Sequence, residues 1–564
     1  MVQNTVARSD TNGVASSGTW TLGSAKGLNT LTASVPGIAS VSFDAYAVLT
    51  SPDVSFDVIA PWPGQPLNDT AGARADMHST YQIASVTVSA PGGPIAQLAL
   101  DPQVNPPPYS WVGTVDLTGQ PRGRLGVVFT ATDVLGNTTD AVVPVVHDLA
   151  PKISVASPRE GTLARPTLAI DATCTDDDPA GCVSLVAEVQ GAVLASGARS
   201  ISTTLDLSAY EGQQIDLALV AVDTIGRQTQ VDRTVFVDSS PRLGVLAQLI
   251  GDVWDVSSTR ILYLDSSGTT PQLNLRDLTT GATSTIETGA DLAQSSPGPG
   301  FLTDVGAIYQ HGIVGSPNPW LFELRNGVLS RLGEGVGLQV TGPWALYTDT
   351  PSSSLLRRDL VAGISNIVGS DPGGDRSIGP SGDIVYELGF NIYRQRGGVL
   401  ETLTTDGSAS TSNIRPVTDG INVVYEKMLP CCTPSGGRPF SIARHDGISE
   451  SQLAPVSNTP PTSPEYAVAN GYVAYLRDDG AGALQVWRHD PQHETQLTFF
   501  ALTSTIDAIA NDGTILLTNP VTKKRYRAVP GLPLQEIGSA LGRVVVRDSS
   551  FFVVIGPNVV AVLP

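Results

Sequence analysis

Two of the four cysteines stand close together and enclose a run of acidic residues. Cys174 and Cys182 bracket the segment Thr-Asp-Asp-Asp-Pro-Ala-Gly. A short loop rich in Asp, Pro and Gly can bring two Cα atoms within disulfide distance. We therefore predict a disulfide, which would indicate an oxidising compartment; two reduced, buried thiols are the alternative. The carboxylates of Asp176, Asp177 and Asp178 offer the hard oxygen ligands that calcium prefers, so the run is either a calcium site or a solvated turn.

The other two cysteines, Cys431 and Cys432, are neighbours inside a loop over residues 428–439. A structural zinc site needs four ligands at workable spacing, and two adjacent cysteines with no close His pattern do not supply them. A disulfide between the neighbours would stiffen the loop, and free thiols are the alternative.

His489 and His493 have the His-x-x-x-His spacing of a metalloprotease helix, with Glu494 beside them. That spacing brings two imidazoles together only on a helix. Here the segment 484–488 has the pattern of a strand, and Asp490-Pro491 would break a helix after it. We expect a hairpin turn and no metal site.

The composition limits the classes of function. The formal net charge is −20, so a nucleic-acid partner is not expected, because phosphate binding needs a basic face. No run of about 18 apolar residues is present, so no membrane-spanning helix is expected. Nucleophile-elbow, phosphate-loop and dinucleotide motifs are also missing from the sequence. A candidate binding or catalytic site must therefore be inferred from the length of the loops and the burial of side chains.

The elements that would position these residues are strands. Between residues 242 and 564 a short apolar run recurs, and six of its copies end in Tyr. The spacing of about 40–50 residues suits a four-stranded propeller blade. The last copy, over 543–563, has three strands, and residues 243–249 can supply the fourth and close the ring. We predict a β-propeller with eight blades favoured and seven possible. The copies end at Tyr263, Tyr309, Tyr347, Tyr386, Tyr425, Tyr475, Leu517 and Val553.

An Arg comes after most copies, near the end of the next strand. We place these arginines toward the rim, as surface charge or paired with the Asp that often stands next in the chain, such as Asp277 or Asp359. The set is Arg276, Arg325, Arg358, Arg394, Arg444, Arg488 and Arg527.

Residues 49–150 and 151–241 are two copies of one module. Six landmarks repeat with a constant offset of 90 residues, among them Asp133 with Asp223 and Asp148 with Asp238. About 90 residues of short strands suit a Greek-key sandwich. In each copy Asp-x-x-Gly is the expected turn of the last hairpin, with Gly supplying the positive φ.

Three resemblances accompany these patterns. Residues 1–48, with Thr-Asn-Gly-Val-Ala, Trp-Thr-Leu-Gly and Leu-Thr-Ala, resemble the C-terminal half of a bacterial invasin/intimin-type immunoglobulin-like domain. The duplicated modules resemble immunoglobulin-like spacers of bacterial surface proteins and of large secreted RHS/YD-repeat proteins. The segments at 418–425 and 496–498 resemble TolB-like propellers. Together they imply an all-β chain: half a domain over 1–48, sandwiches over 49–150 and 151–241, and a propeller over 242–564. Further domains upstream of residue 1 are expected.

Long loops on a rigid scaffold are where recognition usually lies. Four are long here, over residues 289–300, 311–320, 428–439 and 456–464. We predict Trp320 and His311 as binding residues, with packing of Trp320 against its blade as the alternative.

The leading hypothesis is a secreted or cell-surface bacterial protein whose spacers present a propeller to a protein or glycan, with no cofactor except possible calcium. The alternatives are a propeller-based polysaccharide lyase or hydrolase, and the non-catalytic part of a larger RHS/YD-type protein. No catalytic residue is assigned.

Overall fold

The computed structural model is an all-β protein. It describes residues 54–79, 81–101, 109–177, 181–294, 300–313, 315–430, 439–457, 466–478, 480, 483–547 and 549–563, with residues 6, 8–12, 14–16, 19, 27–34 and 40–47 nearer the N-terminus. Its helical elements there are α1 (Asp291–Gln294) and the 3-10 turn η1 (Ser208–Tyr210). In the described residues no helix has the length and apolar character needed to cross a bilayer.

Strands β1 (Gly27–Ala33) and β2 (Val41–Ala47) form an antiparallel ladder of their own. The first module comes next, with its strands joined in the order β3-β5-β8-β7-β6-β9-β10-β4. Its strands are β3 (Val54–Ala60), β4 (Pro66–Leu67), β5 (Thr70–Ser79), β6 (Ile83–Ala90), β7 (Gly93–Leu100), β8 (Tyr109–Asp116), β9 (Gly123–Asp133) and β10 (Thr138–His147).

The second module repeats this topology in two sheets, β11-β13-β16 and β12-β18-β17-β14-β15. Its strands are β11 (Lys152–Ser157), β12 (Thr162–Ala164), β13 (Thr167–Thr175), β14 (Cys182–Val189), β15 (Ala192–Gly197), β16 (Ser200–Asp206), β17 (Gln214–Asp223) and β18 (Gln228–Val237). A short strand pairs parallel with the last strand in both, as β4 with β10 and β12 with β18. The 90-residue duplication therefore has a structural counterpart in the pairing of the strands.

The predicted Asp-x-x-Gly turn is present in both modules. Asp133 Oδ1 accepts the backbone N–H groups of Leu135 and Asn137, and the next glycine, Gly136, has φ +83°. Gly226 has φ +88° at the equivalent position. A carboxylate that accepts N–H groups two and four residues ahead fixes the turn, and the positive φ requires Gly.

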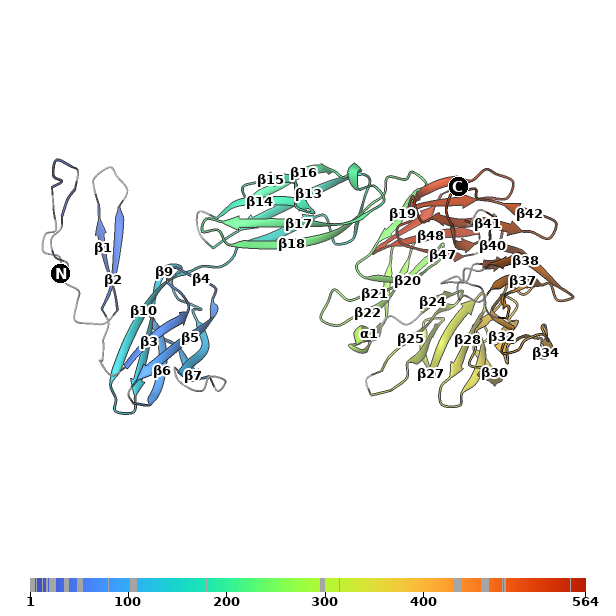
Figure 1. Cartoon of the computed structure of the whole chain (residues 1–564), viewed down its shortest axis with the longest axis horizontal. Coiled ribbons are helices and arrows are strands. Elements are labelled where there is room, and N and C mark those ends of the chain that lie inside the picture. The colour runs from blue at the N-terminus through green and yellow to red at the C-terminus, as the bar shows by residue number, and fades with distance from the viewer. Residues whose placement is uncertain are drawn as a thin grey trace. The chain divides into compact units, whose positions relative to one another are not determined.

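Strands β19–β49 form the propeller, with six four-stranded sheets and one of seven strands (Figure 1). The favoured count of eight blades depends on counting β27 twice, because its first half pairs with β26 and its second half with β28. The first strands of this region are β19 (Leu243–Gln248), β20 (Asp252–Val256), β21 (Arg260–Asp265), β22 (Gln272–Asp277), β23 (Thr283–Thr288), β24 (Gly300–Thr303), β25 (Gly306–His311), β26 (Trp320–Arg325), β27 (Val328–Thr341), β28 (Trp344–Asp349), β29 (Ser354–Asp359) and β30 (Ile364–Ser370).

The remaining strands continue the same antiparallel order within each sheet. They are β31 (Arg376–Ile378), β32 (Ile384–Leu388), β33 (Asn391–Arg396), β34 (Val399–Thr402), β35 (Ser412–Thr418), β36 (Val423–Met428), β37 (Phe440–His445), β38 (Glu450–Ser457), β39 (Tyr466–Ala469), β40 (Tyr472–Asp478), β41 (Leu484–His489), β42 (Glu494–Gln496), β43 (Thr505–Ile509), β44 (Ile515–Asn519), β45 (Lys524–Ala528), β46 (Gln535–Ser539), β47 (Arg543–Arg547), β48 (Ser550–Ile555) and β49 (Asn558–Val562).

The ring closes between the two ends of the propeller. Strand β19 pairs antiparallel with β49, Leu243 opposite Val562, and completes the sheet of β47, β48 and β49. In Figure 1 the green β19 lies in the same blade as the red β48 and β47. The predicted partnership of residues 243–249 with the last three strands is therefore present.

Five of the six repeated Tyr residues are buried in the core of the propeller, as a recurring apolar run predicts, whereas Tyr386 is only partly buried. Tyr309, Tyr425 and Tyr475 have no exposed surface, and Leu517 and Val553 are buried at the copies without Tyr. The apolar runs pack between neighbouring sheets.

Two of the repeated arginines make contacts between strands that the expected surface role does not include. Arg325 of β26 donates to the carbonyl oxygen of Val361, which follows β29, at 3.3 Å. Arg358 of β29 is buried against Glu323 of β26. Asp359 accepts backbone N–H groups of its own turn and not Arg358. Arg325 and Arg358 therefore join one set of strands to the next.

The chain divides into two compact units. One contains residues 1–156, 171–202 and 218–231, and the other contains residues 157–170, 203–217 and 232–564. The second unit thus includes part of the second module together with the whole propeller. Within it, Phe236 of β18 packs with Leu243, Val553, Ile555 and Val560 of the propeller.

Candidate functional site

The predicted disulfide between Cys174 and Cys182 is confirmed, with a Cα–Cα distance of 6.2 Å. Cys174 lies near the end of β13, and Cys182 begins β14. Both cysteines are buried. The disulfide therefore anchors both ends of the acidic loop in the second module, and it restricts where the carboxylates in that loop can lie.

Asp176 and Asp177 of this loop meet a third carboxylate from the linker between β10 and β11. One oxygen each of Asp148, Asp176 and Asp177 lie within 4.8 Å of one another. We call these three residues the linker cluster. Asp178, the third predicted ligand, lies outside the described residues. The linker therefore brings Asp148 to two of the carboxylates that the sequence indicates.

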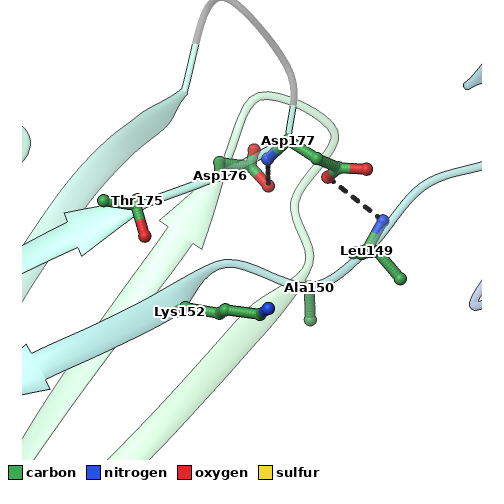
Figure 2. Close-up of a pocket in the computed structure, with 6 residues that line it drawn as sticks. All are labelled: Leu149, Ala150, Lys152, Thr175, Asp176 and Asp177. Carbon is green, nitrogen blue, oxygen red and sulfur yellow. Dashed lines mark hydrogen bonds between the residues drawn. The ribbon is translucent and has the colours of Figure 1, made fainter.

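A cavity of about 200 Å³ opens beside the linker cluster (Figure 2). Figure 2 shows Asp176 and Asp177 above the linker, with Ala150 and Lys152 opposite. Asp177 Oδ1 accepts the backbone N–H of Leu149 at 3.3 Å, which ties the loop to the linker. The cavity is smaller than the sites that usually hold organic ligands, and Asp176, Asp177 and Lys152 give it charged walls, so it suits an ion or water better than an organic ligand.

Two guanidinium groups bind part of the cluster. Arg122 Nε lies 2.9 Å from Asp177 Oδ2, and Arg122 Nη1 lies 2.8 Å from Asp69. Arg227 donates to the carbonyl oxygen of Asp148 and lies 3.3 Å from its Oδ2. Asp176 Oδ2, in contrast, is buried and has no donor among the described residues.

The electrostatics disfavour three free negative charges at this place. Burial, followed by the charges of Asp177 and Asp223, raises the pKa of Asp148, and Arg227 offsets this only in part. Burial, with the neighbouring Asp177 and Asp148 adding to it, also raises the pKa of Asp176. Carboxylates with a raised pKa are stabilised when they bind a proton or when a cation lies beside them.

Sequence reasoning found Asp176 and Asp177 because they are consecutive, and it missed Asp148. Asp148 did appear among the landmarks of the 90-residue repeat, paired with Asp238, but only as a marker of the module boundary. The spacing along the chain does not show that the linker folds back onto the β13–β14 loop.

The predicted binding residues Trp320 and His311 lie opposite each other on β25 and β26. The guanidinium of Arg331 lies 3.4 Å from the centroid of the Trp320 ring, so it covers one face of the indole. His311 is only 3% exposed and stacks on Phe322 at 4.4 Å. The binding role of both residues stays a prediction. His311 Nδ1 lies 2.6 Å from the carbonyl oxygen of Gly312, the first residue of the adjoining loop.

A shared carboxylate holds His311 in place. Glu287 of β23 accepts from Tyr309 Oη at 2.6 Å and faces His311 Nε2 at 3.2 Å. Although burial opposes it, this carboxylate raises the pKa of His311. A similar arrangement joins Tyr425, Lys427 and Glu450 in another blade. Sequence reasoning missed both, because a Tyr-x-base pair does not reveal its acidic partner.

Two candidates from the sequence remain. The pair Cys431 and Cys432 lies outside the described residues. His489 ends β41, and Asp490 Oδ1 accepts the backbone N–H of His493, so the predicted hairpin turn is present and the two imidazoles do not share a helix face.

No model of a protein family matches this chain, and no curated protein matches it. Several solved structures are similar in part. TolB from Acinetobacter baumannii is 11% identical over 55% of this chain and 78% of that chain, with a TM-score of 0.25. Virginiamycin B lyase from Staphylococcus aureus is 12% identical over 47% and 94%, with a TM-score of 0.27. The fibronectin(III)-like modules of Clostridium thermocellum CbhA are 18% identical over 32% and 94%, with a TM-score of 0.20. These values carry no argument about function; the strand order establishes the propeller-type fold.

Proposed function

We propose that this chain is an exported bacterial binding protein in which sandwich modules present a propeller to a protein or glycan. The observation that carries the proposal is the buried polar contact between the second module and the propeller. Asp238, which ends the second module, has no exposed surface, and its Oδ2 accepts the Ser539 hydroxyl at 2.5 Å and the Ser539 backbone N–H at 3.2 Å.

Further contacts surround this one. The Asn558 side chain, buried in β49, donates to the carbonyl oxygen of Gly161 in the second module. Arg165 donates to the carbonyl oxygens of Ser240 and Leu243. Buried polar groups that satisfy each other favour one arrangement over others. The second module thus holds the propeller through buried contacts, which favours a role in presenting a binding surface.

The surface we propose is the face that carries the long loop between β25 and β26, with Trp320 at its end. Trp320 begins β26, the third strand of its blade, whereas Trp344 begins β28, the second strand of the next blade. Adjacent antiparallel strands put these two positions at opposite ends of their blades. Both indoles lie against an Arg, Arg331 or Arg357. Trp344 is therefore a matched control for Trp320.

The test is a glycan-array and cell-surface protein screen of the full chain, run beside a polysaccharide lyase and hydrolase assay. Binding without turnover supports the proposal, and Trp320→Ala should weaken it while Trp344→Ala leaves it unchanged. Turnover of a bound polysaccharide would instead favour the enzymatic alternative. Equal loss in both Trp variants would contradict the choice of face.

A further inference from the structure

The surroundings of the linker cluster contain more acidic than basic side chains. Five carboxylates face three Lys and Arg side chains, an excess of two formal negative charges when His147 beside Asp69 is counted as neutral. Carboxylates gathered in a partly buried place repel one another unless a counter-charge joins them. The acidic residues are Asp69, Asp148, Asp176, Asp177 and Asp223, and the basic ones are Arg122, Arg227 and Lys152.

A second observation concerns Asp223, which lies outside the acidic loop, at the end of β17. Its side chain is only 2% exposed, and its Oδ2 is buried with no donor among the described residues. Its charge acts on Asp148. Figure 2 shows the β17–β18 hairpin, in pale green, passing beside Asp176 and Asp177. A buried carboxylate oxygen without a donor is costly.

In the first module the equivalent of Asp223 is Asp133, and both of its carboxylate oxygens have hydrogen-bond donors. There, Asp133 Oδ2 accepts the Asn137 side-chain amide at 2.8 Å. In the second module Arg227 stands in the place of Asn137, and its guanidinium turns to Asp148 and Asn68. The second copy has thus replaced the donor that would satisfy Asp223 with a residue that points elsewhere.

We propose that the linker cluster binds one calcium ion, with the negative charge of Asp223 beside it. Calcium takes six to eight oxygen ligands in irregular geometry, and water completes sets that the protein leaves open. Asp148, Asp176 and Asp177 supply three carboxylates from two separate segments, and the cavity beside them has room for the remaining ligands. Magnesium requires a near-octahedral set and keeps its waters, which three converging carboxylates do not favour. A divalent ion also balances the excess of two negative charges.

The ion would join two segments that a hydrogen bond from the Leu149 N–H to Asp177 already connects. Asp148 belongs to the linker that leaves the first module, whereas Asp176 and Asp177 belong to the loop closed by Cys174 and Cys182. Calcium bound to both would fix the linker on the second module. Because the disulfide anchors the loop, its reduction should weaken the binding of calcium.

The test is isothermal titration of the EDTA-treated full chain with CaCl₂, and separately with MgCl₂. We expect one calcium per chain, with a Kd in or below the range of about 10⁻⁴–10⁻³ M found for extracellular modules. Asp176→Asn should weaken binding at least about tenfold, because it removes a charged ligand. Asp223→Asn should weaken binding to a smaller degree, because it removes a negative charge beside the cluster. The matched control is Asp133→Asn, the equivalent of Asp223 in the first module, which should bind calcium like the wild type.

Melting in EDTA separates loss of a ligand from loss of the fold. Asp176→Asn removes repulsion, so without calcium it should melt no lower than the wild type. The proposal is overturned if the wild type shows no saturable calcium binding, if Asp133→Asn weakens it as much as Asp223→Asn, or if Asp176→Asn melts lower in EDTA. Magnesium binding of equal strength would contradict the choice of calcium.

Discussion

The ion pair between Glu323 and Arg358 provides a quantitative test of how the propeller holds together. Arg358 Nε and Nη2 donate to the two carboxylate oxygens of Glu323 at 3.0 and 2.6 Å, and both residues are buried. Glu323 lies on β26 and Arg358 on β29, so the pair joins two neighbouring sets of strands. The Glu323→Ala variant would leave the guanidinium with the Ser365 hydroxyl as a remaining partner.

A buried charge that loses its partner costs about 3–5 kcal/mol of folding free energy. The control is Glu536→Ala, which removes an ion pair of a single contact to Lys524 on the exposed surface. Solvent and salt screen such a pair, so we expect no measurable loss there. A double variant, Glu323→Leu with Arg358→Leu, should recover most of the stability, because replacing both partners by apolar groups leaves no buried charge.

Urea unfolding of the full chain, followed by tryptophan fluorescence, measures the three variants against the wild type. We expect the wild type, Glu536→Ala and the double variant to unfold at similar urea concentrations. Glu323→Ala should unfold at a clearly lower concentration. If Glu323→Ala unfolds at the same urea concentration as Glu536→Ala, the buried pair does not join the blades. A double variant less stable than Glu323→Ala would refute the role given to the unpaired charge.

The propeller supports two further predictions. Glu287 raises the pKa of His311 above its ordinary value of 6.5, so the stability from this pair is present below that value and is lost as pH rises through the raised pKa. Melting curves from pH 6 to 9 should show a fall in melting temperature that His311→Gln lacks. An equal fall in the variant would contradict this role of the pair. Deleting residues 559–564 should open the ring between β19 and β49 and give aggregated protein, whereas deleting residues 1–47 should leave the propeller melting unchanged; a C-terminal deletion that melts like the full chain would show that the pairing is dispensable.

The repeating parts of the fold could be predicted because their signals are local. An apolar run ending in Tyr buries its ring in each copy where Tyr309, Tyr425 and Tyr475 stand, and the Asp-x-x-Gly turn fixes its own backbone at Asp133 and Asp223. Such signals lie within a few residues, so one sequence is enough to find them.

The contacts between repeats could not be predicted in the same way. The sequence places Arg358 at the end of a strand, but its partner Glu323 lies about one blade earlier, and nothing local marks which carboxylate faces it. The candidate metal site shows the same limit. Asp176 and Asp177 are adjacent and could be predicted. Asp148 joins them only through the path of the linker, and Asp223 comes near Asp148 only through the β17–β18 hairpin.

The pairing of β19 with β49 has a consequence for assembly of the molecule. These two strands are separated by about 320 residues, and contacts so distant form late. Until β49 arrives, β19 presents an open edge with Val245 and Leu246 exposed. A β49 from a second copy offers the same hydrogen bonds, so two chains refolding at high concentration can exchange their last strands. The yield of monomer on refolding should therefore fall as the protein concentration rises, and the exchanged dimer should carry two complete rings.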